Sequence, residues 1–385
     1  MRIAIVHDWL VTAGGGERVL AEALRAFPGA EVHALIDQMS DADHAALGIP
    51  RAHTTWMQSI PGIGRGYRSW LPLMPLAMRS LNLQGADVVI AISHAVAKAA
   101  PVHSGQKLLC LCLSPMRYAW DLRDQYLDES GLAHGIRGAL ARAVLDRMQS
   151  WDLTTSGRVD KYASISRFIA DRVRRAYGRD SEVIYPPVDT QFFTPRAVSA
   201  ASGVLRPAAG GSESTAPYFI TASRFVPYKR IDLIARAFAG DTNRRLVIVG
   251  DGPDAAKVRA AAGPNVMLVG QASGAELRRW LQGARAFVFA AEEDFGIAPL
   301  EAQACGAPVI AYGKGGVLET IVPFGKPNPT GLFYDAQTVE AIRGALDRFE
   351  ANEAAFTMAA CRQNAERFGA ARFREALTGW VSATE

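Results

Sequence analysis

Short apolar runs alternate with helical patterns along most of the chain. The first series of runs is rich in Val, Ile and Leu and comprises Arg2–Val6, Glu31–Leu35, Val88–Ile92 and Leu108–Leu113. Continuous apolar runs of this kind are typical of parallel strands that are covered on both faces. Polar and apolar residues between them alternate at helical spacing, for example in Glu17–Ala26. The first part of the chain therefore predicts one doubly wound parallel sheet.

A second series of the same kind begins near residue 218. Its predicted strands are Tyr218–Ala222, Leu246–Val249, Val266–Val269, Ala286–Phe289 and Pro308–Ala311. Its predicted helices include Ile231–Ala237 and Ala275–Leu281, and the chain ends on an amphipathic segment, Ala371–Val381. Two series of strands alternating with helices predict an α/β protein with two doubly wound sheets.

The boundary between the two series is visible in the composition. Ala197–Pro217 is rich in Ala, Ser, Gly and Pro, carries few charges and shows no periodicity, so it is predicted to be a linker. The length of 385 residues agrees with two domains. Open α/β sheets bind ligands outside the carboxyl ends of their strands. We therefore expect the ligand in the cleft between the two sheets.

The overall composition excludes several classes of protein. Apolar residues make up 49%, and 42 Lys+Arg against 38 Asp+Glu leave a net charge of only +4. This disfavours a disordered protein and a nucleic-acid binder. The four cysteines and seven histidines show no disulfide framework and no metal-ligand spacing. Without a signal-peptide pattern or an apolar run of ~20 residues, we expect a soluble or peripheral protein in a reducing compartment.

A loop near residue 290 carries two carboxylates beside a predicted helix start. The segment AAEEDFGIAPLEAQACG occupies residues 290–306. Pro299 fits the first turn of a helix and Gly306 a helix end, which predicts Glu301 in the first turn. Glu293 then lies in the loop ahead of the helix. A helix N-terminus binds anions, and carboxylates accept hydrogen bonds from sugar hydroxyls. An acidic loop with a helix cap explains the same residues.

Two cations follow the first strand of the second series. The segment TASRFVPYKRID occupies residues 221–232 and places Arg224 and Lys229 directly after the strand. An Arg as a two-pronged donor and a Lys as a point charge can neutralise a diphosphate. A solvated basic loop is the commoner outcome for such a pair. The binding interpretation gains weight because Glu293 and Glu301 are expected at the same face of the same sheet.

Other strand ends carry weaker candidates. Gly14–Gly16 allow close approach of a ligand to the backbone, although neither this loop nor VGDGPD at 249–254 has the GxGxxG dinucleotide pattern. A glycine loop at 312–320 adds further backbone donors. His7 and His94 each follow an apolar strand, where they face a ligand or serve only as satisfied strand-end histidines.

One long segment combines basic and aromatic residues without any acid. Residues 44–86 contain no Asp or Glu, and their four arginines are interleaved with residues such as Trp56, Tyr67 and Trp70. This combination suits an anionic membrane surface or an acceptor with a lipid diphosphate. Ordinary packing against the first sheet is the alternative.

Taken together, these motifs resemble a known family. The matching segments are HDWLVTAGGGERVL (7–20), PMRYAWD (115–121), SRFIADRVRRAYGRDSEVIYPPVD (166–189), SRFVPYKRID (223–232), VGDGP (249–253), EDFGIAPLEAQACGAPVIAYGKGG (293–316) and LET (318–320). The chain resembles a family 4 retaining glycosyltransferase of the GT-B fold, which has two Rossmann-like domains. Within that family it is most similar to bacterial mannosyltransferases of exopolysaccharide and O-antigen assembly.

The resemblance implies a role for each matching residue. It implies catalytic roles for Glu293, Arg224 and Lys229: Glu293 contacts the donor sugar, and the two cations bind the donor diphosphate. By the same resemblance, Glu301 is expected to hold the nucleotide ribose. Further donor contacts are expected from Gly15, Gly16, Phe295, Gly296, Ile297 and Leu300. Acceptor-side candidates are His7, Asp8, His94, Arg117 and Asp121.

The domains follow from the same resemblance. Residues 1–195 are expected to bind the acceptor, 196–217 to link the domains, and 218–370 to bind the nucleotide sugar. The helix at 371–385 is expected to pack back on the first domain. Leu113 departs from the family, whose mannosyltransferases usually carry His there, and Ile165 replaces an Asn. The missing histidine's role is then absent or transferred to His7 or His94.

The implied reaction moves mannose from GDP-mannose to an oligosaccharide carried on a lipid, polyprenyl diphosphate, with retention of configuration. No metal or other cofactor is expected, since Arg224, Lys229 and the helix start near Pro299 would stabilise the leaving diphosphate. The protein is expected in the cytoplasm, where residues 44–86 would contact the inner face of the membrane. A UDP-sugar donor (glucose or N-acetylhexosamine), a sugar-nucleotide epimerase and an inactive binding protein are the alternatives.

Overall fold

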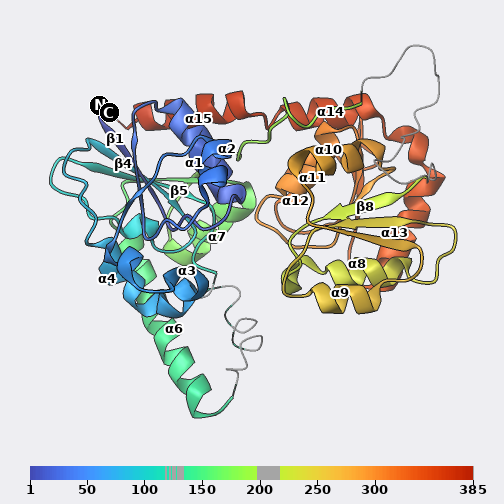
Figure 1. Ribbon diagram of the computed structural model, residues 1–385. Helices are drawn as coiled ribbons and strands as arrows, with labels where there is room; N and C mark the ends of the chain where they lie inside the picture. Colours follow the sequence, from blue (N-terminus) through green and yellow to red (C-terminus); the bar gives the residue numbers. More distant parts are fainter. Residues whose placement is uncertain (118, 121–122, 124–126, 128–133, 197–216, 385) are drawn as a thin grey trace. The chain divides into compact units, whose positions relative to one another are not determined.

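The chain folds into two compact units in the computed structural model (Figure 1). The structure describes residues 1–117, 119–120, 123, 127, 134–196 and 217–384. One unit comprises Met1–Pro187 with Ala371–Glu385, and the other comprises Val188–Ala370. Most of the predicted linker, residues 197–216, lies outside the described residues.

The N-terminal unit is built on a parallel sheet of seven strands in the order β3-β2-β1-β4-β5-β6-β7. The strands are β1 (Ile3–His7), β2 (Glu31–Ala34), β3 (His53–Thr54), β4 (Val88–Ser93), β5 (Lys107–Cys112), β6 (Lys161–Ser164) and β7 (Glu182–Val183). All four predicted strands are present. The sequence analysis missed β3, β6 and β7, because they are short and begin with polar residues.

Helices cover this sheet. They are α1 (Gly15–Ala26), α2 (Asp41–Leu47), α3 (Ile63–Gly66), α4 (Met74–Met78), α6 (Gly135–Ser156), α7 (Arg167–Tyr177) and α15 (Ala370–Ser382), with short 3-10 turns η1 (Trp56–Ser59), η2 (Tyr67–Leu73) and η3 (Ala97–Ala99). The C-terminal helix α15 packs on this unit, where Arg374 pairs with Glu22 and Lys161 Nζ donates to the Trp380 carbonyl at 3.4 Å.

The C-terminal unit has a parallel sheet of six strands in the order β10-β9-β8-β11-β12-β13. Its strands are β8 (Phe219–Ala222), β9 (Leu246–Val249), β10 (Val266–Gly270), β11 (Phe287–Phe289), β12 (Val309–Tyr312) and β13 (Gly331–Tyr334). Its helical segments are η4 (Pro227–Lys229), α8 (Ile231–Phe238), α9 (Ala255–Ala261), α10 (Gly274–Gly283), α11 (Ile297–Ala304), α12 (Val317–Thr320), α13 (Val339–Ala351), η5 (Glu353–Ala355) and α14 (Met358–Glu366).

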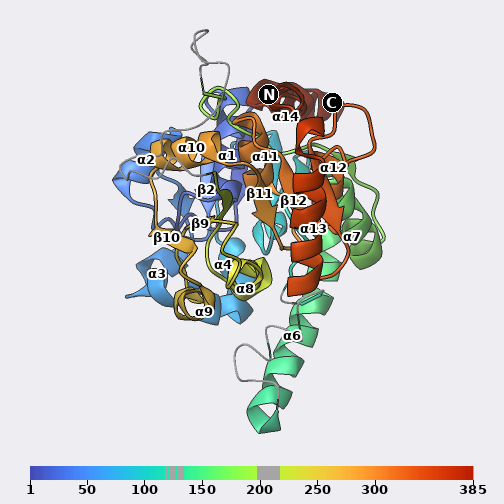
Figure 2. The same cartoon turned by 90° about the vertical axis from the view of Figure 1, so that its right-hand side faces the viewer.

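Successive residues of β8 point to opposite faces of this sheet, and each face has its own core. Phe219 packs with Phe238 of α8 and Phe349 of α13 on one face. Ile220 belongs to the core on the other face, which includes residues of α10 and α11. Figure 2 shows helices on both sides of these strands. This alternation is the period-two pattern of a strand buried on both faces, as predicted.

One strand departs from that prediction. Met267 and Leu268 of β10 are exposed, so the expectation of a strand covered on both faces is wrong here. The reason is position, since β10 forms an edge of the sheet and pairs only with β9. The other edge strand, β13, was not predicted.

The order of strands creates one reversal point in each sheet. From β1 the chain continues to β2 and β3 on one side, whereas from β4 it continues to β5 on the other side. The same reversal occurs between β8 and β11. In open α/β sheets the loops at the carboxyl ends of two such strands diverge, and ligands bind there. The loops after β1, β4, β8 and β11 are therefore the first places to look for a site.

Candidate functional site

The reversal point of the C-terminal sheet holds a lysine and a glutamate in contact. Lys229 ends η4, in the connection that follows β8, and Glu293 lies in the loop that follows β11. The Lys229 ammonium forms an ion pair with the Glu293 carboxylate. Their side chains are 18% and 15% exposed, so the pair is largely withdrawn from water without being sealed from it. Sequence analysis expected the two residues at one face of one sheet, and the structure brings them together.

Arg224 stands beside this connection as an exposed cation. It lies in the loop between β8 and η4. Within the described part of the chain, its guanidinium makes no hydrogen bond or ion pair. A planar donor group left exposed at the carboxyl end of a strand suits recognition of a phosphate by two parallel hydrogen bonds.

Two glycines of the loop after β9 hold the Arg224 loop in place. A Cβ atom at Gly250 would lie 1.9 Å from the Ser223 carbonyl oxygen, and one at Gly252 would lie 2.4 Å from the Phe225 carbonyl oxygen. The Phe225 amide donates to the Asp251 carbonyl at 2.8 Å. VGDGP therefore serves as a close-packed support for the loop that carries Arg224. The comparison with the GxGxxG pattern did not indicate this role.

The glycine loop after β12 supports Glu293 in the same way. The Gly316 amide donates to the Glu293 carbonyl at 2.8 Å. A Cβ atom would lie 2.5 Å from that carbonyl oxygen at Gly315 and 2.4 Å from the Asp294 carbonyl oxygen at Gly316. Both neighbours are backbone atoms, which cannot swing away as a side chain would. The two glycines thus fix the loop that presents the carboxylate.

Helix α11 begins earlier than the sequence indicated. Gly296 is its N-cap at φ +93°, and no side chain caps it. Because the helix starts at Ile297, Glu301 lies beyond the first turn, and the expectation that it lies within that turn is wrong. Glu301 is buried. The burial of Cys305, together with the nearby charge of Glu301, raises the pKa of the Cys305 thiol to about 12.

The residues predicted to contact the donor around this helix can offer backbone groups rather than side chains. The side chains of Phe295 and Leu300 are buried in the core of the C-terminal unit. The uncapped first turn of α11, beginning at Gly296 and Ile297, leaves backbone N–H groups at the positive end of the helix. Together with Arg224 and the Lys229–Glu293 pair, this end of the sheet offers cations and N–H donors for an anion and one carboxylate for hydroxyls.

The reversal point of the N-terminal sheet holds a carboxylate of a different kind. Asp8 follows β1 and is fully buried. Its oxygens accept hydrogen bonds from the backbone amides of His94 (2.5 Å), Ala95 (3.0 Å), Val96 (2.6 Å) and Ala97 (2.6 Å). Burial alone would raise the pKa of Asp8, but the charge and hydrogen bonds of His94 hold it well below its ordinary value. Asp8 thus binds the loop after β4 to β1.

The two predicted histidines lie beside this carboxylate in different states. His94 Nδ1 lies 2.9 Å from the Asp8 carboxylate, and the ring packs edge-on against Trp9 with centroids 4.7 Å apart. His7 is buried, and its Nδ1 donates to the Trp9 carbonyl at 2.9 Å. Burial lowers the pKa of His7, so its ring is neutral at pH 7.

The first glycine loop lies directly over His7. Gly15 and Gly16 open α1, and a Cβ atom at Gly16 would lie 3.2 Å from His7 Nε2 and 3.3 Å from Leu113 Cδ1. The preceding Gly14 amide donates to the Glu17 carboxylate at 3.1 Å, which fixes the turn. Leu113, which stands where the resembling family carries histidine, therefore contacts the same glycine as His7.

A buried charge cluster that sequence analysis missed supports the neighbouring loop. Lys98 forms an ion pair with Asp152, and both are almost fully buried. Asp152 also accepts hydrogen bonds from Trp120 Nε1 at 2.9 Å and from the Tyr177 hydroxyl at 2.7 Å. The predicted candidate Arg117 lies in the same segment as Trp120, with its Nε 3.4 Å from the Ser114 hydroxyl. Asp121 lies outside the described residues.

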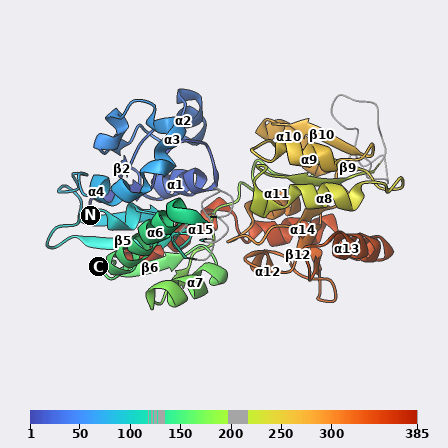
Figure 3. The ribbon, with the colours of Figure 1, turned by 90° about the horizontal axis from the view of Figure 1, so that it is seen from below.

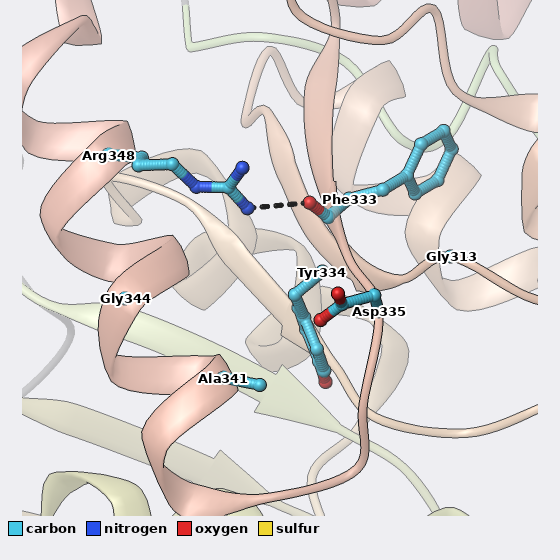
Figure 4. Close-up of a pocket in the computed structure, with 7 residues that line it drawn as sticks. All are labelled: Gly313, Phe333, Tyr334, Asp335, Ala341, Gly344 and Arg348. Carbon is cyan, nitrogen blue, oxygen red and sulfur yellow. Dashed lines mark hydrogen bonds between the residues drawn. The ribbon is translucent and has the colours of Figure 1, made fainter.

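A pocket of about 450 Å³ lies elsewhere in the C-terminal unit (Figure 4). It is lined by Gly313, Phe333, Tyr334, Asp335, Ala341, Gly344 and Arg348. Arg348 spans it to donate to the Phe333 carbonyl at 2.8 Å. None of the predicted site residues lines this pocket. Among the described residues, no group of three or more His, Cys, Asp or Glu side chains is arranged to hold a metal ion.

Each half of the chain matches a family model of glycosyltransferases. Residues 13–192 match the family model "Glycosyltransferase Family 4", and residues 206–368 match "Glycosyl transferases group 1". The two matches together span most of the chain.

Curated relatives include several mannosyltransferases. A GDP-mannose-dependent monoacylated alpha-(1-6)-phosphatidylinositol monomannoside mannosyltransferase of Corynebacterium glutamicum is 31% identical over 49% of this chain and 52% of its own length. A GDP-mannose-dependent alpha-(1-6)-phosphatidylinositol monomannoside mannosyltransferase of Mycobacterium tuberculosis is 32% identical over 54% and 55% of the two chains. The chain thus spans about half the length of these relatives.

Solved structures show the same fold over the whole chain. Anabaena HepE, solved in complex with UDP and glucose, superposes with a TM-score of 0.67 at 16% identity and covers 99% of both chains. The sucrose-phosphate synthase of Thermosynechococcus elongatus gives a TM-score of 0.70 at 18% identity over 100% of this chain and 99% of that one. The fold is GT-B, as the sequence predicted.

Proposed function

We propose that this chain, which belongs to the glycosyltransferases of the GT-B fold, transfers mannose from GDP-mannose to a lipid-linked oligosaccharide with retention of configuration. The observation that carries the proposal is the Lys229–Glu293 ion pair at the reversal point of the C-terminal sheet, next to the exposed Arg224. Cations for a diphosphate and a carboxylate for sugar hydroxyls are the two kinds of group that a nucleotide sugar requires. The names of the curated relatives support GDP-mannose as the donor.

The residues act on the step in which the nucleoside diphosphate departs. Negative charge then develops on the β-phosphate oxygen while the sugar becomes oxocarbenium-like. Lys229, Arg224 and the N–H groups at the start of α11 would stabilise that charge, each preorganised donor contributing about 3–4 kcal/mol. Glu293 would accept hydrogen bonds from the mannose hydroxyls once the diphosphate draws Lys229 away from it. The proposed reaction uses no metal.

A lipid-linked acceptor calls for a surface that meets the membrane, and the N-terminal unit carries a suitable one. Trp56, Trp70, Leu73 and Leu76 expose large apolar side chains within the segment 44–86, which has no acidic residue. Figures 1 and 3 show α3, α4 and α6 at one end of this unit. Apolar and basic side chains together favour an anionic bilayer.

Helix α6 adds to that surface. Ile136 and Leu140, one turn apart, are 91% and 68% exposed. Arg137 and Arg142 lie in the same half of the helix, whose first acidic residue is Asp146. These side chains support the proposal that the protein works at the inner face of the membrane, and we propose the synthesis of a surface polysaccharide as its pathway. Among the described residues, no helix has both the length and the hydropathy to cross a bilayer.

A donor panel tests the proposal. Purified protein is incubated with GDP-mannose, UDP-glucose and UDP-N-acetylhexosamines, with and without EDTA, on extracted lipid-linked acceptors, and the products are analysed by mass spectrometry and by NMR of the anomeric proton. We expect an α-mannosyl product that EDTA does not abolish. Transfer from a UDP-sugar alone would replace the donor assignment, and a new sugar nucleotide formed without acceptor would indicate an epimerase.

Variants of the ion pair show whether this site carries the reaction. Lys229→Ala and Arg224→Ala should each lower turnover roughly 10²–10³-fold, the loss of one preorganised donor. Lys257→Ala is the matched control, since this exposed lysine of the same unit pairs with Asp232 and should leave turnover unchanged. Full activity of Glu293→Ala would remove that residue from the site.

A further inference from the structure

The described residues of the N-terminal unit include two aspartate–histidine pairs, which differ in whether the imidazole has a ring nitrogen free of protein partners. In the first pair His44 Nε2 lies 2.9 Å from Asp37, and His44 Nδ1 lies 2.9 Å from the Ile49 carbonyl. Both ring nitrogens are therefore engaged, and the side chain is only 8% exposed. Arg51 also reaches Asp37 at 3.4 Å, so this pair joins the segments around α2. Its role is structural.

In the second pair only one ring nitrogen is engaged. His94 Nδ1 lies 2.9 Å from the Asp8 carboxylate, and the ring is 30% exposed. Within the described part of the chain, no hydrogen bond reaches His94 Nε2. The pair sits at the reversal point between β1 and β4, at the edge of the sheet where α/β proteins bind ligands.

The groups around His94 decide which ring nitrogen faces a ligand. Asp8 is ionised and acceptor-only, so His94 donates to it from Nδ1, and Nε2 is the ring nitrogen that points away from Asp8. His7, with its ring centroid 6.2 Å away, is neutral and adds no charge. Trp9 packs against the ring and fixes its plane. Glu17 is the other ionisable group near His7.

Asp8 is itself unavailable to a ligand. It is fully buried, and four backbone amides occupy its oxygens together with His94. Its rigid attachment to the β4 loop holds the imidazole in one orientation. Of this pair, only Nε2 of His94 is left to contact a ligand.

We propose that His94 Nε2 forms a hydrogen bond with a sugar hydroxyl bound at the carboxyl edge of the N-terminal sheet, and that Asp8 is the positioning residue for that contact. The inference rests on the proposed function, since that function supplies the sugar. The hydroxyl belongs either to the glycan acceptor or to the sugar of the donor. Both sources offer the same hydroxyl group to the same nitrogen.

Two substitutions separate this contact from the pairing with Asp8. The amide of His94→Asn can still donate to Asp8 from about the position of Nδ1 but has no polar atom at the position of Nε2. The longer His94→Gln places an amide oxygen near Nε2. We expect His94→Asn to lower kcat/KM about 10–100-fold, the range for one lost hydrogen bond to a buried partner, and His94→Gln to restore part of it.

The KM for the acceptor and the affinities for GDP-mannose and for GDP identify the source of the hydroxyl. A raised KM for the acceptor with unchanged affinity for GDP-mannose assigns the hydroxyl to the acceptor. A fall in the affinity for GDP-mannose relative to GDP assigns it to the donor sugar. If His94→Asn leaves both the acceptor KM and this affinity ratio unchanged, the proposal is overturned.

A matched control excludes a general loss of structure. His44→Asn removes the imidazole of the structural pair. It should lower the melting temperature without changing the KM for the acceptor or the affinity for GDP-mannose relative to GDP. Failure of the proposed function has a different signature, because the wild-type protein would then transfer no mannose and would show no preference for GDP-mannose over GDP.

Discussion

The two sheets use charge in opposite ways at equivalent positions. Each sheet reverses between its first and fourth strands, and each places a carboxylate in a loop beside that point. Asp8 of the N-terminal sheet is consumed by four amides and a histidine of its own unit. Glu293 of the C-terminal sheet pairs with a lysine from the loop across the reversal point and stays partly exposed. A carboxylate tied to backbone builds structure, whereas one held by another side chain can change partners.

The sharpest test of this comparison is the free energy of unfolding. Asp8→Asn removes a buried charge, turns one acceptor into a donor that faces N–H groups, and should lower the unfolding free energy by about 3–5 kcal/mol. Lys229→Ala should lower it by less than about 2 kcal/mol, because that pair is partly solvated. Denaturant titration of both variants measures the difference. Equal losses would contradict the distinction between the two carboxylates.

Substitution of a glycine that packs against the Glu293 loop should have the next largest effect on the free energy of unfolding. Gly316→Ala would place a methyl group 2.4 Å from the Asp294 carbonyl oxygen and 2.5 Å from the Phe295 Cα. We expect a loss of about 1–3 kcal/mol together with weakened nucleotide binding, measured by denaturation and calorimetry. Gly344→Ala is the control, because its Cβ would meet nothing within 4 Å inside α13 and should stabilise by up to about 1 kcal/mol. A stable, tightly binding Gly316→Ala would show that the loop is not fixed there.

The smallest expected effect concerns pH and His7. Burial lowers the pKa of His7 below its ordinary 6.5, so below pH 6.5 the unfolded chain binds a proton that the folded chain refuses. Stability therefore falls as the pH drops below 6.5, by at most about 1.4 kcal/mol per pH unit from this group. His7→Asn keeps a donor for the Trp9 carbonyl and should flatten the slope of melting temperature against pH between 5 and 6.5. An unchanged slope would show that the folded chain binds a proton at His7 as readily as the unfolded chain does.

The sequence predicted the arrangement of strands better than the purpose of individual side chains. Apolar runs located the longer strands, and the rule that parallel strands share a carboxyl edge brought Lys229 and Glu293 to one face. The short strands β3 and β7 have two residues each, too few for any period to show. The start of α11 was placed too late because Pro299 fits a first turn at several positions, whereas Gly296 caps the helix by its backbone conformation alone.

The fate of Asp8 could not be predicted from the motif that contains it. Nothing in the HDWL motif indicates that the amides which bind the Asp8 carboxylate lie in the loop after β4, more than eighty residues away. The same holds for Gly250 and Gly316, whose close contacts are made across the sheet by loops distant in sequence. Local patterns specify elements, whereas contacts between loops depend on which strands become neighbours.

Because Lys229 and Glu293 neutralise each other, their ion pair affects which molecules can bind at the carboxyl edge of the C-terminal sheet. In the proposed reaction, a nucleoside diphosphate alone would pair with the ammonium but leave the carboxylate without a partner, whereas an intact sugar nucleotide would supply a partner for each. The leaving nucleoside diphosphate would then bind less tightly than the sugar nucleotide. The ion pair would therefore favour release of the nucleoside diphosphate product and weaken inhibition by free nucleotides.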